Sequence, residues 1–217
     1  MDVFPFIVAG SYSIGIAAII AVVRIRKIHK SYRPFLLFLF ASLTNEISSN
    51  LLIQYGKSNA VGNNIFGFTE ALIWVWQFKE WKAIDLRRWY QALIVTGILL
   101  IWITENIILG KLFSFSSVYA VVYSSAMVLI SINVIIRQIV EESRNLFLNA
   151  RFLICSGMLI FSAYRILVES FYLLEIEGSN VFLGNVFLIL VFVNLFVNLL
   201  LAIATLWIPT RQKFTLR

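Results

Sequence analysis

The sequence has very few of the residues that form disulfides and metal sites. It contains one cysteine, Cys155, and one histidine, His29, among 217 residues. An intramolecular disulfide needs two thiols, and a protein zinc site needs several histidine or cysteine ligands. The composition therefore excludes both kinds of site, and we expect neither a metal nor another cofactor.

Charge is also scarce. Only 13% of the residues are charged and 60% are hydrophobic, and the mean hydropathy is +0.88. Soluble domains normally carry about 25% charged residues. This composition excludes a water-soluble domain and predicts an integral membrane protein. Spans of about 20 residues would use nearly the whole chain and leave no sizeable soluble domain.

Apolar runs follow one another along the entire chain, and each is long enough to cross a hydrocarbon core of about 30 Å. We predict an all-α, polytopic membrane protein with a single seven-helix transmembrane domain over residues 1–217. The predicted spans are 3–23, 34–54, 61–79, 90–109, 114–136, 149–173 and 181–207. The third run is the most polar, so we expect neighbouring helices to shield it from lipid.

The distribution of basic residues predicts the orientation. Fifteen of the eighteen lysines and arginines follow the first, third, fifth or seventh run. They are Arg24, Arg26, Lys27, Lys30, Arg33, Lys79, Lys82, Arg87, Arg88, Arg137, Arg144, Arg151, Arg211, Lys213 and Arg217. The alternate connections hold only Lys57 and Lys111. The positive-inside rule then places the N-terminus outside and the C-terminus in the cytoplasm, which we take to be bounded by the plasma membrane.

Polar residues recur with helical period inside several predicted spans, and in lipid such faces must point to other helices or to water. The second span has such a stripe at Ser42, Asn45, Glu46, Ser49 and Asn50, and the third has one at Asn63, Gly67, Glu70, Trp74 and Gln77. The sixth span carries Ser162, Arg165 and Glu169, and the seventh carries Asn194 and Asn198.

From these stripes we predict a ligand-binding set in which acids outnumber bases. The set is Glu46, Asn50, Glu70, Arg165, Glu169 and Asn194. A charged residue at the centre of a span costs about 2.5–3.5 kcal/mol, so each must be paired, hydrated or neutralised. Arg165 can pair with Glu169 along its own helix or with another acid across the bundle. Either way, at least one carboxyl group lacks a protein cation, and burial favours its protonated form unless water or a bound cation supports the charge.

Three functions are compatible with the sequence. The favoured one is an outward-facing acidic pocket that binds or transports a small cationic or polar solute, or protons. The second is a non-catalytic membrane subunit, a sensor or an assembly scaffold, whose polar residues are interhelical hydrogen bonds worth about 0.6 kcal/mol each. The third is an intramembrane enzyme acting on lipid with Glu46 and Glu70 as an acid–base pair, although no nucleophile or histidine base supports it.

The expected partners follow from the same features. They are membrane lipids, a small solute and, for the scaffold hypothesis, a membrane protein that contacts the basic connections. The net charge of +7 does not indicate nucleic acid, because the basic residues are scattered over several connections and form no single face.

Overall fold

The computed structural model describes residues 4–83, 88–141, 146–174 and 180–210. Within these ranges the chain is almost entirely helical and forms no strand beyond an isolated bridge between Ile28 and Thr210. The prediction of an all-α fold is therefore confirmed. The helices are α1 (Phe4–Tyr12), α2 (Ile14–Arg24), α3 (Arg33–Gln54), α4 (Ala60–Glu80), α5 (Arg88–Ile103), α6 (Ser117–Glu141), α7 (Ala150–Leu173) and α8 (Asn180–Trp207).

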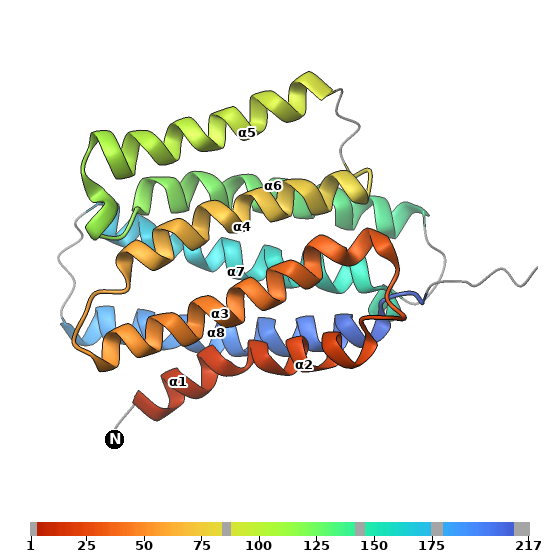
Figure 1. The fold of residues 1–217 in the computed structure, drawn as a ribbon, viewed down its shortest axis with the longest axis horizontal. Helices are drawn as coiled ribbons and strands as arrows, with labels where there is room; N and C mark the ends of the chain where they lie inside the picture. The colour runs from red at the N-terminus through yellow and green to blue at the C-terminus, as the bar shows by residue number, and fades with distance from the viewer. Residues whose placement is uncertain (1–3, 84–87, 142–145, 175–179, 211–217) are drawn as a thin grey trace, which may run out of the picture.

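Successive helices run antiparallel and side by side, with α1 and α2 forming one bent rod (Figure 1). The start of α1 and the connections 55–59 and 109–116 lie at one end of the bundle, which we call the amino end. The connection 25–32, the ends of α4, α6 and α8 and the start of α7 lie at the opposite end, which we call the basic end. The name reflects the described basic residues gathered there, among them Arg24, Lys82, Arg137 and Arg151.

Within the described ranges, four helical segments are long and apolar enough to cross a membrane: Lys30–Gln54, Ser117–Val140, Ala150–Leu173 and Leu188–Trp207. Two shorter apolar helices cover Val8–Arg24 and Leu93–Ile108. Large apolar side chains on the outside of the bundle are strongly exposed, for example Val23 at 77% and Leu129 at 70%. An apolar exterior of this extent is consistent with a membrane protein.

The helix ends lie within a few residues of the predicted spans, with two informative differences. The first predicted span is divided at Ser13, whose Oγ donates a hydrogen bond to the carbonyl oxygen of Gly10 at 2.5 Å, a bond that bends helices. The fifth begins at Ser117 instead of 114, because residues 114–116 belong to a connection held by side chains of α4 and of the π-helical turn η2 (Thr104–Ile108).

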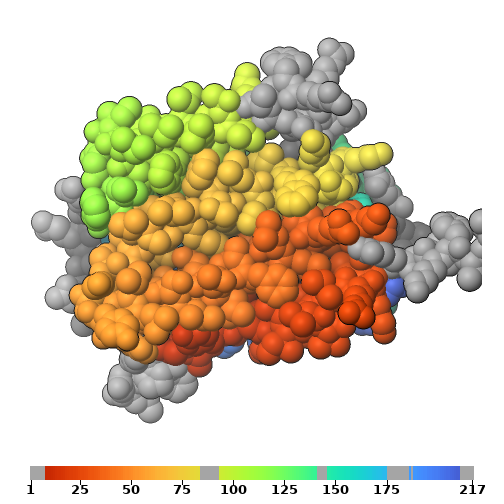
Figure 2. Space-filling view, in the orientation of Figure 1, coloured from red at the N-terminus to blue at the C-terminus, as the bar shows by residue number. Residues whose placement is uncertain are grey.

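The helices form a closed ring in chain order. The bent rod of α1 and α2 packs on α3, α3 on α4, α4 on α5, α5 on α6, α6 on α7 and α7 on α8, and α8 returns to α1 and α2. The side chains of α2, α3, α4 and α5 cover one face of this ring (Figure 2). The α3–α4 pair and the α7–α8 pair therefore face each other across the interior.

The half of the interior nearest the basic end is filled by apolar and aromatic side chains. Phe35 and Phe38 of α3 pack against Trp74 and Phe78 of α4, with ring centroids between 5.1 and 6.5 Å apart along the cluster. We call these four residues the aromatic floor, because the polar part of the interior begins on the side of them that faces the amino end.

Two sets of polar contacts fix the helix ends at the basic end. Gln77, fully buried, accepts a hydrogen bond from the Phe35 backbone N–H at 2.7 Å and donates one to the Ser31 carbonyl at 2.8 Å. The Arg24 guanidinium donates to the carbonyl oxygens of Thr205 and Leu206 in the last turn of α8, and to that of Ile208 just after the helix. These contacts tie α4 to the start of α3, and α2 to the end of α8.

Candidate functional site

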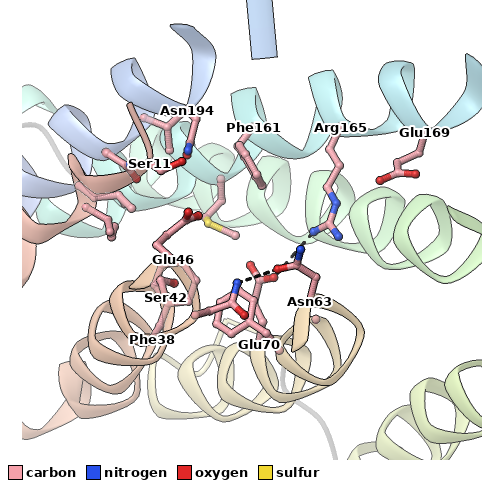
Figure 3. A pocket seen from close by; sticks show the side chains of 18 of the residues that line it. Ser11, Phe38, Ser42, Glu46, Asn63, Glu70, Phe161, Arg165, Glu169 and Asn194 are labelled. Atoms are coloured by element: carbon pink, nitrogen blue, oxygen red, sulfur yellow. Dashed lines mark hydrogen bonds and ion pairs between the residues drawn. The ribbon is translucent and has the colours of Figure 1, made fainter. Parts of the chain in front are cut away.

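A polar cavity of about 270 Å³ lies in the interior between the aromatic floor and the amino end (Figure 3). It occupies the space where the α3–α4 pair faces the α7–α8 pair. Its polar lining consists of Ser11, Ser42, Asn45, Glu46, Asn63, Glu70, Arg165, Glu169, Asn194 and Asn198. The deep residues Met158 and Leu201 are buried, whereas Phe115 at the other limit of the lining is 57% exposed, so the cavity opens in the amino half of the bundle.

The cavity contains one loose ion pair. Glu70 on α4 is only 5% exposed, and its Oε2 lies 3.8 Å from Nη1 of Arg165 on α7. The buried hydroxyl group of Tyr123 on α6 lies near the Glu70 carboxyl group. The pair links two helices that are not neighbours in the ring.

The other two carboxyl groups of the cavity have no cationic partner among the described residues. Glu46 projects from α3 into the cavity and lies next to the Ser11 hydroxyl, and Glu169 lies one helical turn from Arg165 on α7 (Figure 3). Neither forms an ion pair with any residue that the structure describes. Arg165 therefore pairs across the bundle with Glu70, and not along its own helix with Glu169.

Amide side chains line the remaining polar wall. Asn45 Nδ2 donates to Asn63 Oδ1 at 2.9 Å, and the Ser49 hydroxyl donates to the same oxygen at 3.3 Å, which joins α3 to α4. On the opposite wall, Asn198 Nδ2 donates to Ser13 Oγ at 2.8 Å and so joins α8 to the bend between α1 and α2.

The structure brings together five of the six residues in the predicted ligand-binding set. Glu46, Glu70, Arg165, Glu169 and Asn194 line the cavity, whereas Asn50 does not, and its buried Nδ2 has no hydrogen-bond partner among the described residues. Asn45, Asn63 and Asn198 belonged to the polar stripes but not to the predicted set. Ser11 could not be predicted as part of the cavity, because Ser11 and Ser13 stand alone in an otherwise apolar run and do not recur with helical period.

Several other buried polar residues of the stripes and their surroundings have structural partners outside the cavity. Glu105 in η2 accepts hydrogen bonds from the backbone N–H groups of Val118 and Tyr119 and so caps the start of α6. Asn64 on α4 donates to the Ser114 carbonyl at 2.7 Å. The Asn106 side chain accepts a hydrogen bond from the Ser116 hydroxyl at 2.7 Å. These contacts hold the 109–116 connection in place. A carboxylate such as that of Glu105 is favourable at a helix N-terminus, where backbone N–H groups are free to donate.

The separation of the carboxyl groups limits what the cavity can hold. No three His, Cys, Asp or Glu side chains within the described ranges lie close enough together to hold one metal ion. Three carboxyl groups spread over the walls, with one guanidinium group and several amides, instead suit a cation that contacts the walls at several points, or protons. An anion would face the larger number of carboxyl groups.

The chain matches no protein family, and neither a similar curated protein nor a similar solved structure was found.

Proposed function

We propose that this chain is a multi-pass membrane protein of seven spans that binds a small cationic solute in its polar cavity. In this proposal the N-terminus lies outside and the C-terminus in the cytoplasm of the plasma membrane. The antiparallel ring and the collection of basic residues at one end support this orientation. The polar α4 and the short α1, α2 and α5 would cross the membrane as members of the same ring, shielded in part by the more apolar helices.

The observation that carries the proposal is the surplus of acids in one cavity. Among the described lining residues, Glu46, Glu70 and Glu169 share the cavity with one basic residue, Arg165. Two unit charges about 6 Å apart interact by about 3 kcal/mol at an effective dielectric constant of 20. Two carboxylates without a cation therefore give the cavity a strong preference for positive charge. The same surplus allows the carboxyl groups to take up protons when no other cation is bound.

The size of the cavity restricts the solute. Ligand pockets are typically about 300–1,000 Å³, so 270 Å³ lies at the lower limit and suits a molecule of few heavy atoms. The asparagine and serine side chains add hydrogen-bonding groups for a polar solute. The aromatic floor separates the cavity from the basic end, so this conformation supports binding from the amino side, and transport would require the floor to open.

Replacement of both unpaired acids is expected to weaken cation binding. We expect the E46Q/E169Q variant to bind ethylammonium about 100-fold more weakly than the unchanged protein. Each lost carboxylate is expected to lower the affinity roughly tenfold, which corresponds to about 1.4 kcal/mol of binding free energy. Isothermal titration calorimetry of the purified protein in mild detergent measures the affinity for ethylammonium. The Gln substitutions keep the shape and hydrogen-bonding capacity of the side chains.

The matched control is E80Q, which removes one negative charge from an exposed position of α4 near the basic end. Its affinity for ethylammonium should equal that of the unchanged protein. Equal affinities for the unchanged protein and the double variant would overturn the proposal and favour a structural role for the polar residues, as in a sensor or assembly subunit.

A further inference from the structure

A second cavity, of about 220 Å³, lies at the basic end of the bundle, where α4 and α6 end and α7 begins. It is lined by Trp81, Lys82, Ala83, Val134, Arg137, Gln138 and Arg151. It shares no lining residue with the acidic cavity. Its ligand chemistry can therefore be argued independently of the proposed solute.

The charged residues among the described lining of this second cavity all have one sign. Lys82, Arg137 and Arg151 come from three separate segments of the chain, and none forms an ion pair with a residue in the described ranges. Lys82 adopts a left-handed backbone conformation with φ of 51°, which is uncommon for a residue with a side chain. Its carbonyl oxygen lies 3.5 Å from Arg137 Nη1. The cationic groups are thus gathered around the turn at Lys82 that follows α4.

A buried donor without a partner lines the same cavity. Trp81 is 6% exposed, and its Nε1–H makes no hydrogen bond with any described residue. The Arg151 guanidinium lies over the Trp81 ring, 5.8 Å from the ring centroid, which holds the arginine at the cavity. A buried N–H group normally has an acceptor, and a ligand in this cavity would supply one.

The neutral amide in the lining also presents a donor. The Gln138 side-chain oxygen already accepts a hydrogen bond from Asn149 Nδ2 at 2.8 Å, so its NH₂ group remains to donate. Three cations, an indole N–H and an amide NH₂ form a set of donors that matches an oxyanion such as a phosphate group.

The surroundings indicate the source of that phosphate. On the outside of α6, next to the cavity, the apolar residues Ile136, Ile139 and Val140 are 54%, 53% and 79% exposed. They offer a surface for acyl chains beside a site for a charged headgroup. Basic pockets between membrane helices bind anionic headgroups in this way. We propose that this cavity binds the phosphate group of an anionic membrane lipid, which bridges the ends of α4 and α6 and the start of α7.

The test uses the whole protein in mild detergent and counts bound lipids by native mass spectrometry. We expect phosphatidylglycerol to bind at least tenfold more tightly than phosphatidylcholine, and we expect the R137Q/R151Q variant to lose this preference. The variant R26Q/K27Q is the control, because it removes the same charge from exposed positions at the same end of the bundle. It should keep the preference.

A milder variant guards against misfolding. W81F keeps the ring under Arg151 but removes the N–H donor, and it should weaken phosphatidylglycerol binding several-fold without changing the binding of phosphatidylcholine. Equal losses in R137Q/R151Q and R26Q/K27Q would show a diffuse surface effect and overturn the proposal. Displacement of phosphatidylglycerol by an equal concentration of inorganic phosphate would show that the site takes free phosphate, and would overturn the assignment to lipid.

Discussion

Replacement of Arg165 by glutamine is expected to destabilise the fold and at the same time to strengthen cation binding. Removing one partner of a buried ion pair costs about 3–5 kcal/mol, and because the Arg165 side chain is 24% exposed we expect a loss of about 2 kcal/mol in the free energy of unfolding. The loss arises because Glu70 remains in the cavity without its cation. A bound cation can then take the place of the guanidinium group.

The gain in affinity should be about tenfold for ethylammonium. The Coulomb term for removing one nearby positive charge is larger than this, but protonation of Glu70 in the empty cavity will offset part of it. Equilibrium unfolding in mixed detergent gives the stability, and calorimetry gives the affinity. An R165Q variant that binds ethylammonium more weakly than the unchanged protein would contradict the role assigned to Arg165.

The double variant R165Q/E70Q separates the two effects. Because neither charge remains, its stability should return to within about 1 kcal/mol of that of the unchanged protein, as expected for two residues that interact directly. Its affinity for ethylammonium should be lower than that of R165Q, since one carboxylate is lost. If the two substitutions destabilise additively, Glu70 and Arg165 are not coupled as the 3.8 Å separation implies.

Replacement of Gln77 by leucine is expected to destabilise the fold by about 2–4 kcal/mol without affecting the polar cavity. Gln77 is fully buried and pairs with two backbone groups, the Phe35 N–H and the Ser31 carbonyl. Each buried polar group left without a partner costs about 1–3 kcal/mol. Equilibrium unfolding measures the loss, and the affinity for ethylammonium should stay unchanged in the folded fraction.

The control for this prediction is Q54L on α3. Gln54 is exposed at the end of the helix, so the same substitution there should change the free energy of unfolding by less than about 0.5 kcal/mol. Equal effects of Q77L and Q54L would mean that the start of α3 does not depend on the Gln77 contacts.

Much of the cavity could be predicted from the sequence, because a polar helical stripe in lipid must face other helices or water. The stripe around Glu46 and the one around Glu70 have the period of one helix face, and both faces point into the ring. Arg165, the arginine in the middle of the sixth span, lies in the same space for the same reason. The helix ranges were predictable as well, since the apolar runs are long and the prolines Pro5, Pro34 and Pro209 lie at their ends.

The partner of each polar residue could not be predicted, because it depends on contacts between helices distant in the sequence. Gln77 shares a stripe with Glu70 but pairs with the start of α3, outside the cavity. Glu105 caps α6, although a glutamate at the end of an apolar run gives no sign of such a role. Asn50 belongs to the α3 stripe by its spacing, but the cavity is lined only by the earlier members of that stripe, Ser42, Asn45 and Glu46.

The basic residues illustrate the same limit. Their distribution among connections predicts an orientation, which needs only a count along the chain. It does not distinguish Arg24, which binds the carbonyl end of α8, from Arg151, which stands over Trp81 beside the second cavity. These roles depend on which segments meet at the basic end.

The charge preference of the polar cavity tests the central claim most directly. Calorimetric titration of the unchanged protein with ethylammonium, ethanol and acetate, which are similar in size and differ in charge, measures it at constant ionic strength. We predict the tightest binding for ethylammonium, weaker binding for ethanol and none for acetate. Binding of acetate as tight as that of ethylammonium, or no difference among the three solutes, would contradict the account.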